Sequence, residues 1–144
     1  MKNSAEIFKE IRNHYTREKA ISELKKLINF YNKASPSILA RFIFLDKINL
    51  NGKGIEKTTF FQIGIVKNLS LSLNEHRLRI KLLLSLRDRK FKTNFEREIN
   101  LEDMIQIIPL KTAPRNNPFS KKAKVITEED IRNQIKEEGE KNGK

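Results

Sequence analysis

The chain reads RLRIKLLLSLRDRK from Arg77 to Lys90, and in this stretch cationic and aliphatic residues alternate with a period of two. A period of two is that of a β-strand, whose successive side chains point to opposite faces of a sheet. The pattern therefore predicts a strand with one face in a core and one cationic face in solvent. The aliphatic face consists of Leu78, Ile80, Leu82, Leu84 and Leu86, and the cationic face of Arg77, Arg79, Lys81 and Arg87.

Positive charge is concentrated in and just after this strand. Residues 77–97 hold eight Lys/Arg and two acids, in a chain of 144 residues with a net charge of +12. Because Lys and Arg contacts to phosphates release condensed counterions, such a surface is typical of proteins that bind polyanions. Five of the eight are arginines, whose planar guanidinium suits bidentate phosphate contacts and stacking on bases.

The composition indicates one small domain. Apolar residues make up 38% of the chain and charged residues 33%, so the core is expected to be small with polar extensions around it. Since there is no cysteine, neither disulfides nor a thiolate metal site can form, which favours an intracellular setting. The first residues lack the apolar run of a secretory signal and no apolar stretch is long enough to cross a bilayer, so we expect a soluble, cytoplasmic protein.

Three segments of different character follow one another along the chain. Residues 1–36 are predicted to form amphipathic helices over 4–33, with Ser4 and Thr16 as candidate N-caps. Residues 37–110 are predicted to form a small β domain. Residues 111–144 are predicted to be a flexible or helical extension, a basic arm followed by a charged helix that starts near Thr127.

The β domain is expected to contain five short strands. They are predicted at 38–45, 58–66, 77–87, 91–99 and 105–110, with turns at 51–54 and 88–90 and one helical turn at 100–104. Gly64 indicates a bulge or a close backbone approach, while residues 68–75 fit a paired strand, a bulge or a turn. Short strands at this spacing, after helices, predict an α+β protein with a small barrel or strongly bent sheet.

Residue patterns of catalysis are missing from the sequence. His14 and His76 are far apart and neither has a metal-ligand or nucleophile–base spacing beside it. The acid clusters at 102–103 and 128–130 fit helix starts, where the macrodipole favours them, and the glycines at 51–54 lack the spacing of a phosphate-binding loop. We therefore expect no enzyme activity, no catalytic residues, no metal and no cofactor. Acids also dilute the cations of the N-terminal helices, so no membrane partner is expected.

Two segments carry a family resemblance. Residues 61–66, FQIGIV, resemble the glycine-bearing second strand of the Sm-like fold, and residues 104–109, MIQIIP, are similar to its closing segment, particularly in the bacterial RNA chaperone Hfq. The resemblance covers residues 38–110 and implies a five-stranded Sm/SH3-like barrel, RNA binding in post-transcriptional regulation, and assembly into a homo-oligomer. Leu101-Glu102 replaces the family's uridine-contacting Lys-His pair, which implies that arginines bind RNA here instead.

The predicted function is thus that of a non-enzymatic RNA-binding protein that grips phosphates, with DNA left open as an alternative partner. An exposed cationic strand can also serve solubility and protect against edge-to-edge aggregation, which is the alternative interpretation of the same residues. The candidate nucleic-acid-binding residues are Arg77, Arg79, Lys81, Arg87, Arg89, Lys90, Lys92, Arg97, Lys121, Lys122 and Lys124.

Two other functions remain open from the sequence. Residues 68–70 resemble the start of the ligand-binding turn of PilZ domains, which implies a cyclic di-GMP receptor whose ligand contacts Arg41, Asn68 and Ser70; Leu73 stands where that family has glycine. The second alternative is a structural adaptor whose helices dock on a partner protein, without nucleic acid.

Overall fold

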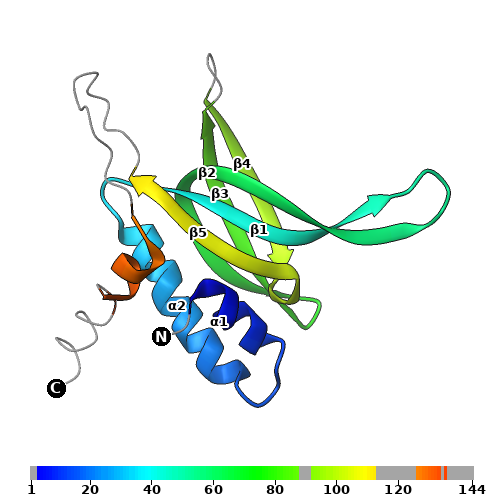
Figure 1. Cartoon of the computed structure of the whole chain (residues 1–144), viewed down its shortest axis with the longest axis horizontal. Coiled ribbons are helices and arrows are strands. Elements are labelled where there is room, and N and C mark those ends of the chain that lie inside the picture. Colours follow the sequence, from blue (N-terminus) through cyan, green and yellow to red (C-terminus); the bar gives the residue numbers. More distant parts are fainter. Residues whose placement is uncertain (1–2, 88–91, 113–125, 134, 136–144) are drawn as a thin grey trace.

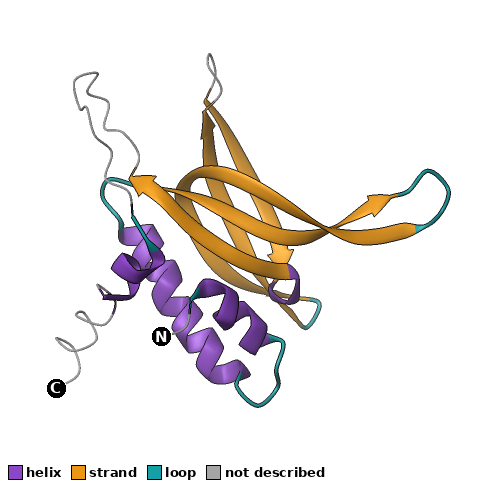
Figure 2. Ribbon diagram, viewed as in Figure 1, coloured by secondary structure: helices purple, strands orange, loops and turns teal. Residues whose placement is uncertain are grey.

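The computed structural model describes residues 3–87, 92–112, 126–133 and 135. The strands form one antiparallel sheet in the order β4-β3-β2-β1-β5, and Figures 1 and 2 show the helices gathered against one end of the curved sheet. This confirms the expected α+β class with five strands. The elements are α1 (Ser4–Ile11), α2 (Arg17–Lys33), β1 (Ile38–Asn49), β2 (Ile55–Asn74), β3 (Arg77–Arg87), β4 (Lys92–Asn100), the 3₁₀ turn η1 (Leu101–Asp103) and β5 (Met104–Thr112).

Strand β2 is much longer than the sequence pattern predicts and serves two neighbours. Its first half pairs with β1, from Asn49↔Ile55 to Leu39↔Ile65, and its second half pairs with β3, from Ile65↔Ser85 to Asn74↔Arg77. A register shift between Val66 and Asn68 lies where the strand passes from one partner to the other. Bulges increase local bend and twist, so this irregularity lets the sheet curl. Residues 68–74 are therefore paired strand.

Gly64 lies at the start of this bend and allows two strands to approach closely. A Cβ atom at this position would be 2.9 Å from the Cβ of Leu84 and 3.0 Å from a methyl carbon of Leu86. No larger residue fits there without moving the backbone. The close backbone approach expected from the sequence is confirmed.

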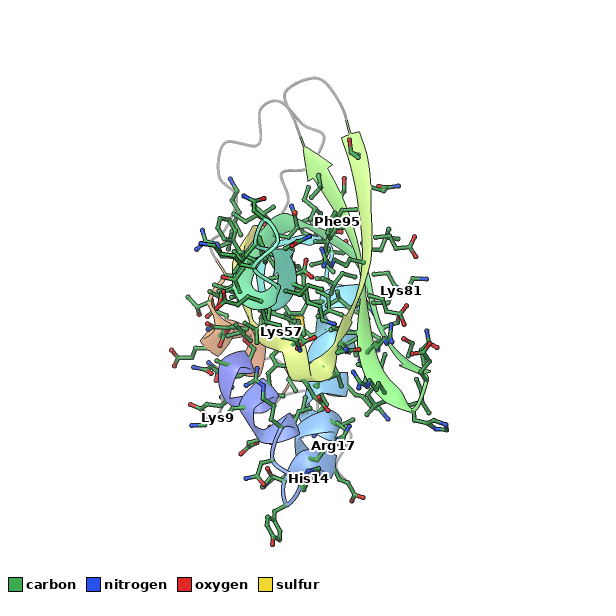
Figure 3. All side chains as sticks on the ribbon, turned by 90° about the vertical axis from the view of Figure 1, so that its right-hand side faces the viewer. Lys9, His14, Arg17, Lys57, Lys81 and Phe95 are labelled. Carbon is green, nitrogen blue, oxygen red and sulfur yellow. The ribbon has the colours of Figure 1, made fainter. Side chains whose placement is uncertain are left out.

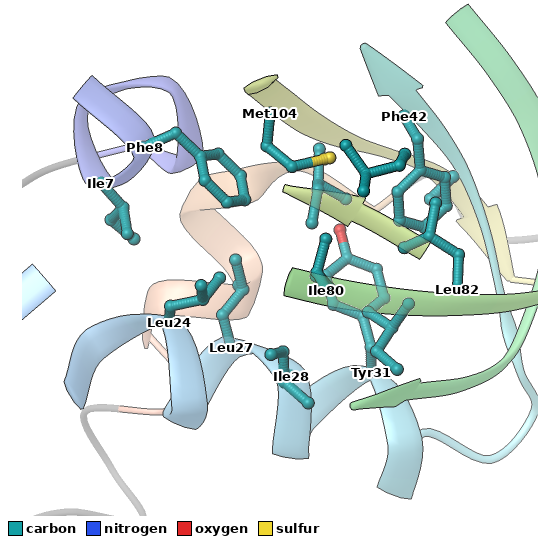
Figure 4. Packing of buried hydrophobic residues seen from close by; sticks show 14 of the residues in the cluster. Ile7, Phe8, Leu24, Leu27, Ile28, Tyr31, Phe42, Ile80, Leu82 and Met104 are labelled. Atoms are coloured by element: carbon teal, nitrogen blue, oxygen red, sulfur yellow. The ribbon is translucent and has the colours of Figure 1, made fainter. Parts of the chain in front are cut away.

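The core lies between the helices and one face of the sheet, here called the core face. Figure 4 shows Phe8 and Leu24 of the helices on one side of this core and Phe42 and Leu82 of the strands on the other, with Tyr31 and Ile80 between them. Burial alternates along β3 as the sequence predicts, since Ile80, Leu82 and Leu84 have no exposed surface. Helices and sheet thus share one core, to which Ile131 near the C-terminal end also belongs.

Helix α1 covers part of the edge of β5. The Ser4 hydroxyl donates to the carbonyl oxygen of Ile107 at 2.8 Å and accepts from its N–H at 3.0 Å. An uncovered strand edge invites pairing with another chain, and this contact occupies one residue of it. The prediction that Ser4 caps α1 is wrong, because the Asn3 side chain accepts from the N–H of Glu6 and is the N-cap. Thr16 takes the N-cap position of α2 without a side-chain cap bond.

A short helical segment within residues 128–133 lies against the body of the protein. Thr127 and Asp130 exchange hydrogen bonds between their side chains and backbone N–H groups, which is a capping box. Glu128 accepts from the N–H of Ser4 at 3.2 Å and from its hydroxyl at 2.7 Å. A helix start at Thr127 is therefore confirmed, and it is held against α1 by polar contacts and by buried Ile131.

Candidate nucleic-acid interface

The cationic face of β3 carries as many acids as cations among its described side chains. Glu98 of β4 pairs across from Lys81, and Glu96 lies two residues along on the same face. The Lys81 Nζ is 2.7 Å from the Glu96 carboxylate, and Arg79 is 3.8 Å from Glu75. The hydrogen bond from Lys81 to Glu96, with the negative charges of Glu96 and Glu98, raises the pKa of Lys81.

These acids weaken the case for a phosphate-binding surface on this face. Arg79 lies beside Glu75 and Lys81 beside Glu96 and Glu98, and Glu98 also accepts from the Ser72 hydroxyl at 2.5 Å. Exposed ion pairs contribute little stability and open readily, but their summed field at a distance is near neutral. Among the described side chains, which do not include those of Arg87 and Lys92, the attraction of this face for a polyanion is therefore weaker than the sequence pattern predicts.

Arg97 lies on the opposite face of the sheet from Arg77, Arg79 and Lys81. It pairs across from buried Leu82, binds the carboxylate of Asp46, and holds its guanidinium carbon 5.1 Å from the centre of the Phe44 ring. Asp46 and Phe44 belong to β1, so the sheet curls enough for β4 to contact β1 through side chains. The prediction that Arg97 shares one surface with Arg77, Arg79 and Lys81 is wrong, because the register places it on the core face.

The Asp46–Arg97 contact makes stability depend on pH. Burial alone raises the pKa of the Asp46 carboxyl, but hydrogen bonds from Arg97 and from the N–H of Lys47, together with the Arg97 charge, outweigh burial and lower it. A carboxyl with a lowered folded-state pKa stabilises the fold above its unfolded pKa of about 4, and that contribution disappears as the pH falls through the folded pKa.

We expect Asp46→Asn to be less stable than the natural chain at neutral pH, with the difference shrinking in acid. Urea unfolding of both proteins at several pH values between neutral and strongly acidic measures it. A difference in the free energy of unfolding that stays constant across this range contradicts the assigned contact.

The side chains of all the remaining predicted residues lie outside the described part of the chain. Arg89, Lys90, Lys121, Lys122 and Lys124 fall in residues 88–91 and 113–125, as does the predicted corner at 88–90. The backbones of Arg87 and Lys92 pair with each other at the end of the β3–β4 ladder. The contribution of all seven residues to nucleic-acid binding stays a prediction.

A different surface of the sheet combines cations with an exposed aromatic ring. It is the outward side of the β1–β2 hairpin, here called the hairpin face and made of Arg41, Lys47, Lys57 and Phe61. Since Ala40, Phe42 and Phe44 of β1 point into the core, alternation turns its odd-numbered residues outward. Lys47 and Lys57 are directly paired across the two strands. Phe61 pairs with Ile43, which is the next residue after Arg41 on the same face of β1.

Arg41 and Phe61 form the centre of the hairpin face. The Arg41 guanidinium carbon lies 5.3 Å from the centre of the Phe61 ring, and the ring is 64% exposed. Within the described residues Arg41 makes no hydrogen bond or ion pair, so its charge is not neutralised. A cation beside an exposed ring is the arrangement that stacks a base and contacts its phosphate.

The lysines extend this positive surface toward the tip of the hairpin. Lys57 is 2.8 Å from Asp103 and half exposed, whereas Lys47 and the turn residue Lys53 have no acidic partner among the described residues. Asn51, Gly52 and Gly54 adopt positive φ angles of 41°, 83° and 110°, which make the tight turn that presents Lys53. Figure 1 shows this hairpin reaching beyond the rest of the sheet.

The sequence contained a signal for the hairpin face that the charge pattern hid. Phe60 and Phe61 are adjacent in a strand, so one of them must point away from the core. Phe60 is 37% exposed and Phe61 64%, which identifies the outward ring. The nucleic-acid-binding residues predicted from charge density lie mainly in residues 77–97 instead.

The structure does not gather the residues of the cyclic di-GMP alternative. Arg41 pairs with Ile63, whereas Asn68 and Ser70 pair with Leu83 and Lys81, beyond the bulge of β2. Five residues of strand separate positions 63 and 68, a distance of about 16 Å at the usual rise. A ligand of that kind therefore has no compact site formed by these three residues.

The described residues contain no group of three or more His, Cys, Asp and Glu side chains placed to hold a metal ion. His14 lies in the loop between the helices and His76 in the turn after β2, and Figure 3 shows His14 far from Lys81 on the sheet. No helix in the described part of the chain is long and apolar enough to cross a membrane. Comparison with known proteins finds no matching family model, no matching curated protein and no matching solved structure.

Proposed function

We propose that this protein binds single-stranded RNA, without enzymatic activity, through the hairpin face. The observation that carries the proposal is the exposed Phe61 ring beside the unpaired Arg41, continued by Lys47 and Lys57. Proteins that bind single strands combine a cationic track for the backbone with aromatic rings on which bases stack. The net charge of +12 adds long-range attraction for any polyanion.

An Sm/SH3-like barrel of the RNA-chaperone type is the form of the fold that we propose. Support comes from the strand order β4-β3-β2-β1-β5, from the single 3₁₀ turn before β5, and from the contact of Arg97 with Asp46 across the curl of the sheet. In this proposal the hairpin face takes the role that the missing Lys-His pair has in that family.

A salt series on the unaltered chain tests the proposal. Filter binding of oligouridylate and oligoadenylate should give a log Kd that rises linearly with log salt, with a slope of about 0.7 per phosphate neutralised on a single strand. Three or four hairpin cations thus predict a slope of roughly 2 to 3. Fully paired RNA should bind more weakly, because its bases cannot stack on Phe61.

Absence of binding at low salt, or a Kd that does not change with salt, contradicts RNA binding. Calorimetry with cyclic di-GMP tests the receptor alternative. A saturable heat of binding that persists at high salt would support cyclic di-GMP, and not RNA, as the ligand.

A further inference from the structure

A cavity of about 370 Å³ lies between the helices, β5 and the C-terminal helical segment, away from the hairpin face. Its apolar wall comes from Ile7 of α1, Leu27 of α2 and Ile131 of the C-terminal segment, all at most 8% exposed. Figure 4 shows Ile7, Leu27 and Tyr31 on the helices that form this side of the core. The volume and the apolar lining are those of a site for a small molecule.

Tyr31 contributes a side chain with a hydroxyl donor to the lining of this cavity. The residue is 2% exposed and lines the cavity, and its hydroxyl makes no hydrogen bond with the described part of the chain. Burial, and then the negative charge of Glu128, raise the pKa of this hydroxyl, so it stays protonated and can donate. The Tyr31 side chain thus combines an apolar ring with a donor at one wall of the cavity.

Arg132 adds a second unpaired donor. Its Nη2 atom has no accessible surface and no hydrogen-bond partner in the residues described, and the side chain lines the same cavity. Lys19 and Lys26 of α2 also line it. Because Nη2 itself is not accessible, a ligand in the cavity would meet the rest of the Arg132 side chain, and the positive charge of the guanidinium favours an anionic acceptor there.

The cations in the lining of the cavity outnumber the acids, three to two. Both carboxylate oxygens of Glu128 accept hydrogen bonds from Ser4, and one also accepts from Gln106 at 3.4 Å. Glu23 is the other acid in the lining, against the cations Lys19, Lys26 and Arg132. The polar part of the cavity is thus rich in donors and carries excess positive charge.

We propose that this cavity binds a small amphipathic carboxylate, such as a medium-chain fatty acid, with its tail among Ile7, Leu27 and Ile131 and its carboxylate at the guanidinium group of Arg132. The ligand contacts α1, α2 and the C-terminal segment together, and so holds that segment against the body of the protein. This proposal does not depend on RNA binding.

Tyrosine fluorescence reports on the cavity directly. The chain has no Trp and two Tyr, of which Tyr15 is 99% exposed. In a Tyr15→Phe variant the only remaining tyrosine lines the cavity, so titration with decanoate below its micelle concentration should give a saturable change in emission. Decan-1-ol has the same tail and no charge. It should bind at least about tenfold more weakly than decanoate, because it lacks the charged hydrogen bonds of the carboxylate.

The variant Arg132→Leu, in the Tyr15→Phe background, should weaken decanoate at least about tenfold and leave decan-1-ol unchanged. Magnetisation transfer by NMR between the decanoate chain and the Tyr31 ring in the unaltered protein provides a measurement that no substitution can disturb. Failure to saturate, or absence of that transfer, overturns the site. Equal affinity for decanoate and decan-1-ol overturns the carboxylate as the ligand's head group.

Discussion

Replacing Phe61 with Ala should weaken the binding of single-stranded RNA about 5- to 150-fold, because stacking of one base on an aromatic ring contributes about 1–3 kcal/mol. The ring is 64% exposed, so its loss should change the free energy of unfolding by less than about 0.5 kcal/mol. Titration of labelled oligouridylate by fluorescence anisotropy measures the change in Kd, and urea unfolding verifies that the variant is folded.

The matched control is Tyr15→Ala. Tyr15 is the most exposed of the large apolar and aromatic side chains described, at 99%, and lies in the loop between α1 and α2, away from the β1–β2 hairpin. Its loss should leave the Kd unchanged. If both variants lose affinity equally, the effect is not specific to the hairpin face. If Phe61→Ala binds RNA as tightly as the natural chain, the Phe61 ring does not stack on bases.

The second large effect concerns the core face of β3. Leu82 has no exposed surface, and Leu82→Ala should lower the free energy of unfolding by about 2–5 kcal/mol, since it removes buried methyl groups and leaves a cavity. The neighbouring change Leu83→Ala removes the same atoms from the outer face, where the side chain is half-buried. We expect it to cost about 1 kcal/mol or less.

Urea unfolding of the two leucine variants, followed by circular dichroism, measures this difference. Because the two residues are adjacent in one strand, only the orientation of the side chain separates them. Equal destabilisation contradicts the assignment of faces in β3, and with it the register that places Glu98 opposite Lys81.

The sequence predicted the elements that rest on local pattern. The period of two in residues 77–87 identified the core face of β3, and the break at residues 100–104 identified the 3₁₀ turn before the last strand. Gly64 was recognised as a close approach because only a residue without a side chain tolerates one. The full length of β2 was missed, since the bulge near Lys67 shifts the phase of its alternation and hides its continuity.

The candidate site could not be predicted in the same way, because it depends on which strands become neighbours. The acids of β4 lie beside Lys81 only in one register, which the hydrophobic pattern and the turn between β3 and β4 set together. The β3–β4 register turns Arg97 inward, and its partner Asp46 is 51 residues away in the chain. Its exposure and its distance from Arg41 identify Phe61 as a candidate, and both depend on the folded structure.

The most direct test of the hairpin face compares two triple variants that remove equal charge. One carries Lys47→Gln, Lys53→Gln and Lys57→Gln; the other carries Arg77→Gln, Arg79→Gln and Lys81→Gln. Oligouridylate Kd values across a salt series for both proteins and for the natural chain provide the measurement. We predict a large loss of affinity and a salt slope reduced by about 2 for the hairpin variant, with little change for the β3 variant. Equal losses in the two variants, or a larger loss from the β3 variant, would contradict the account.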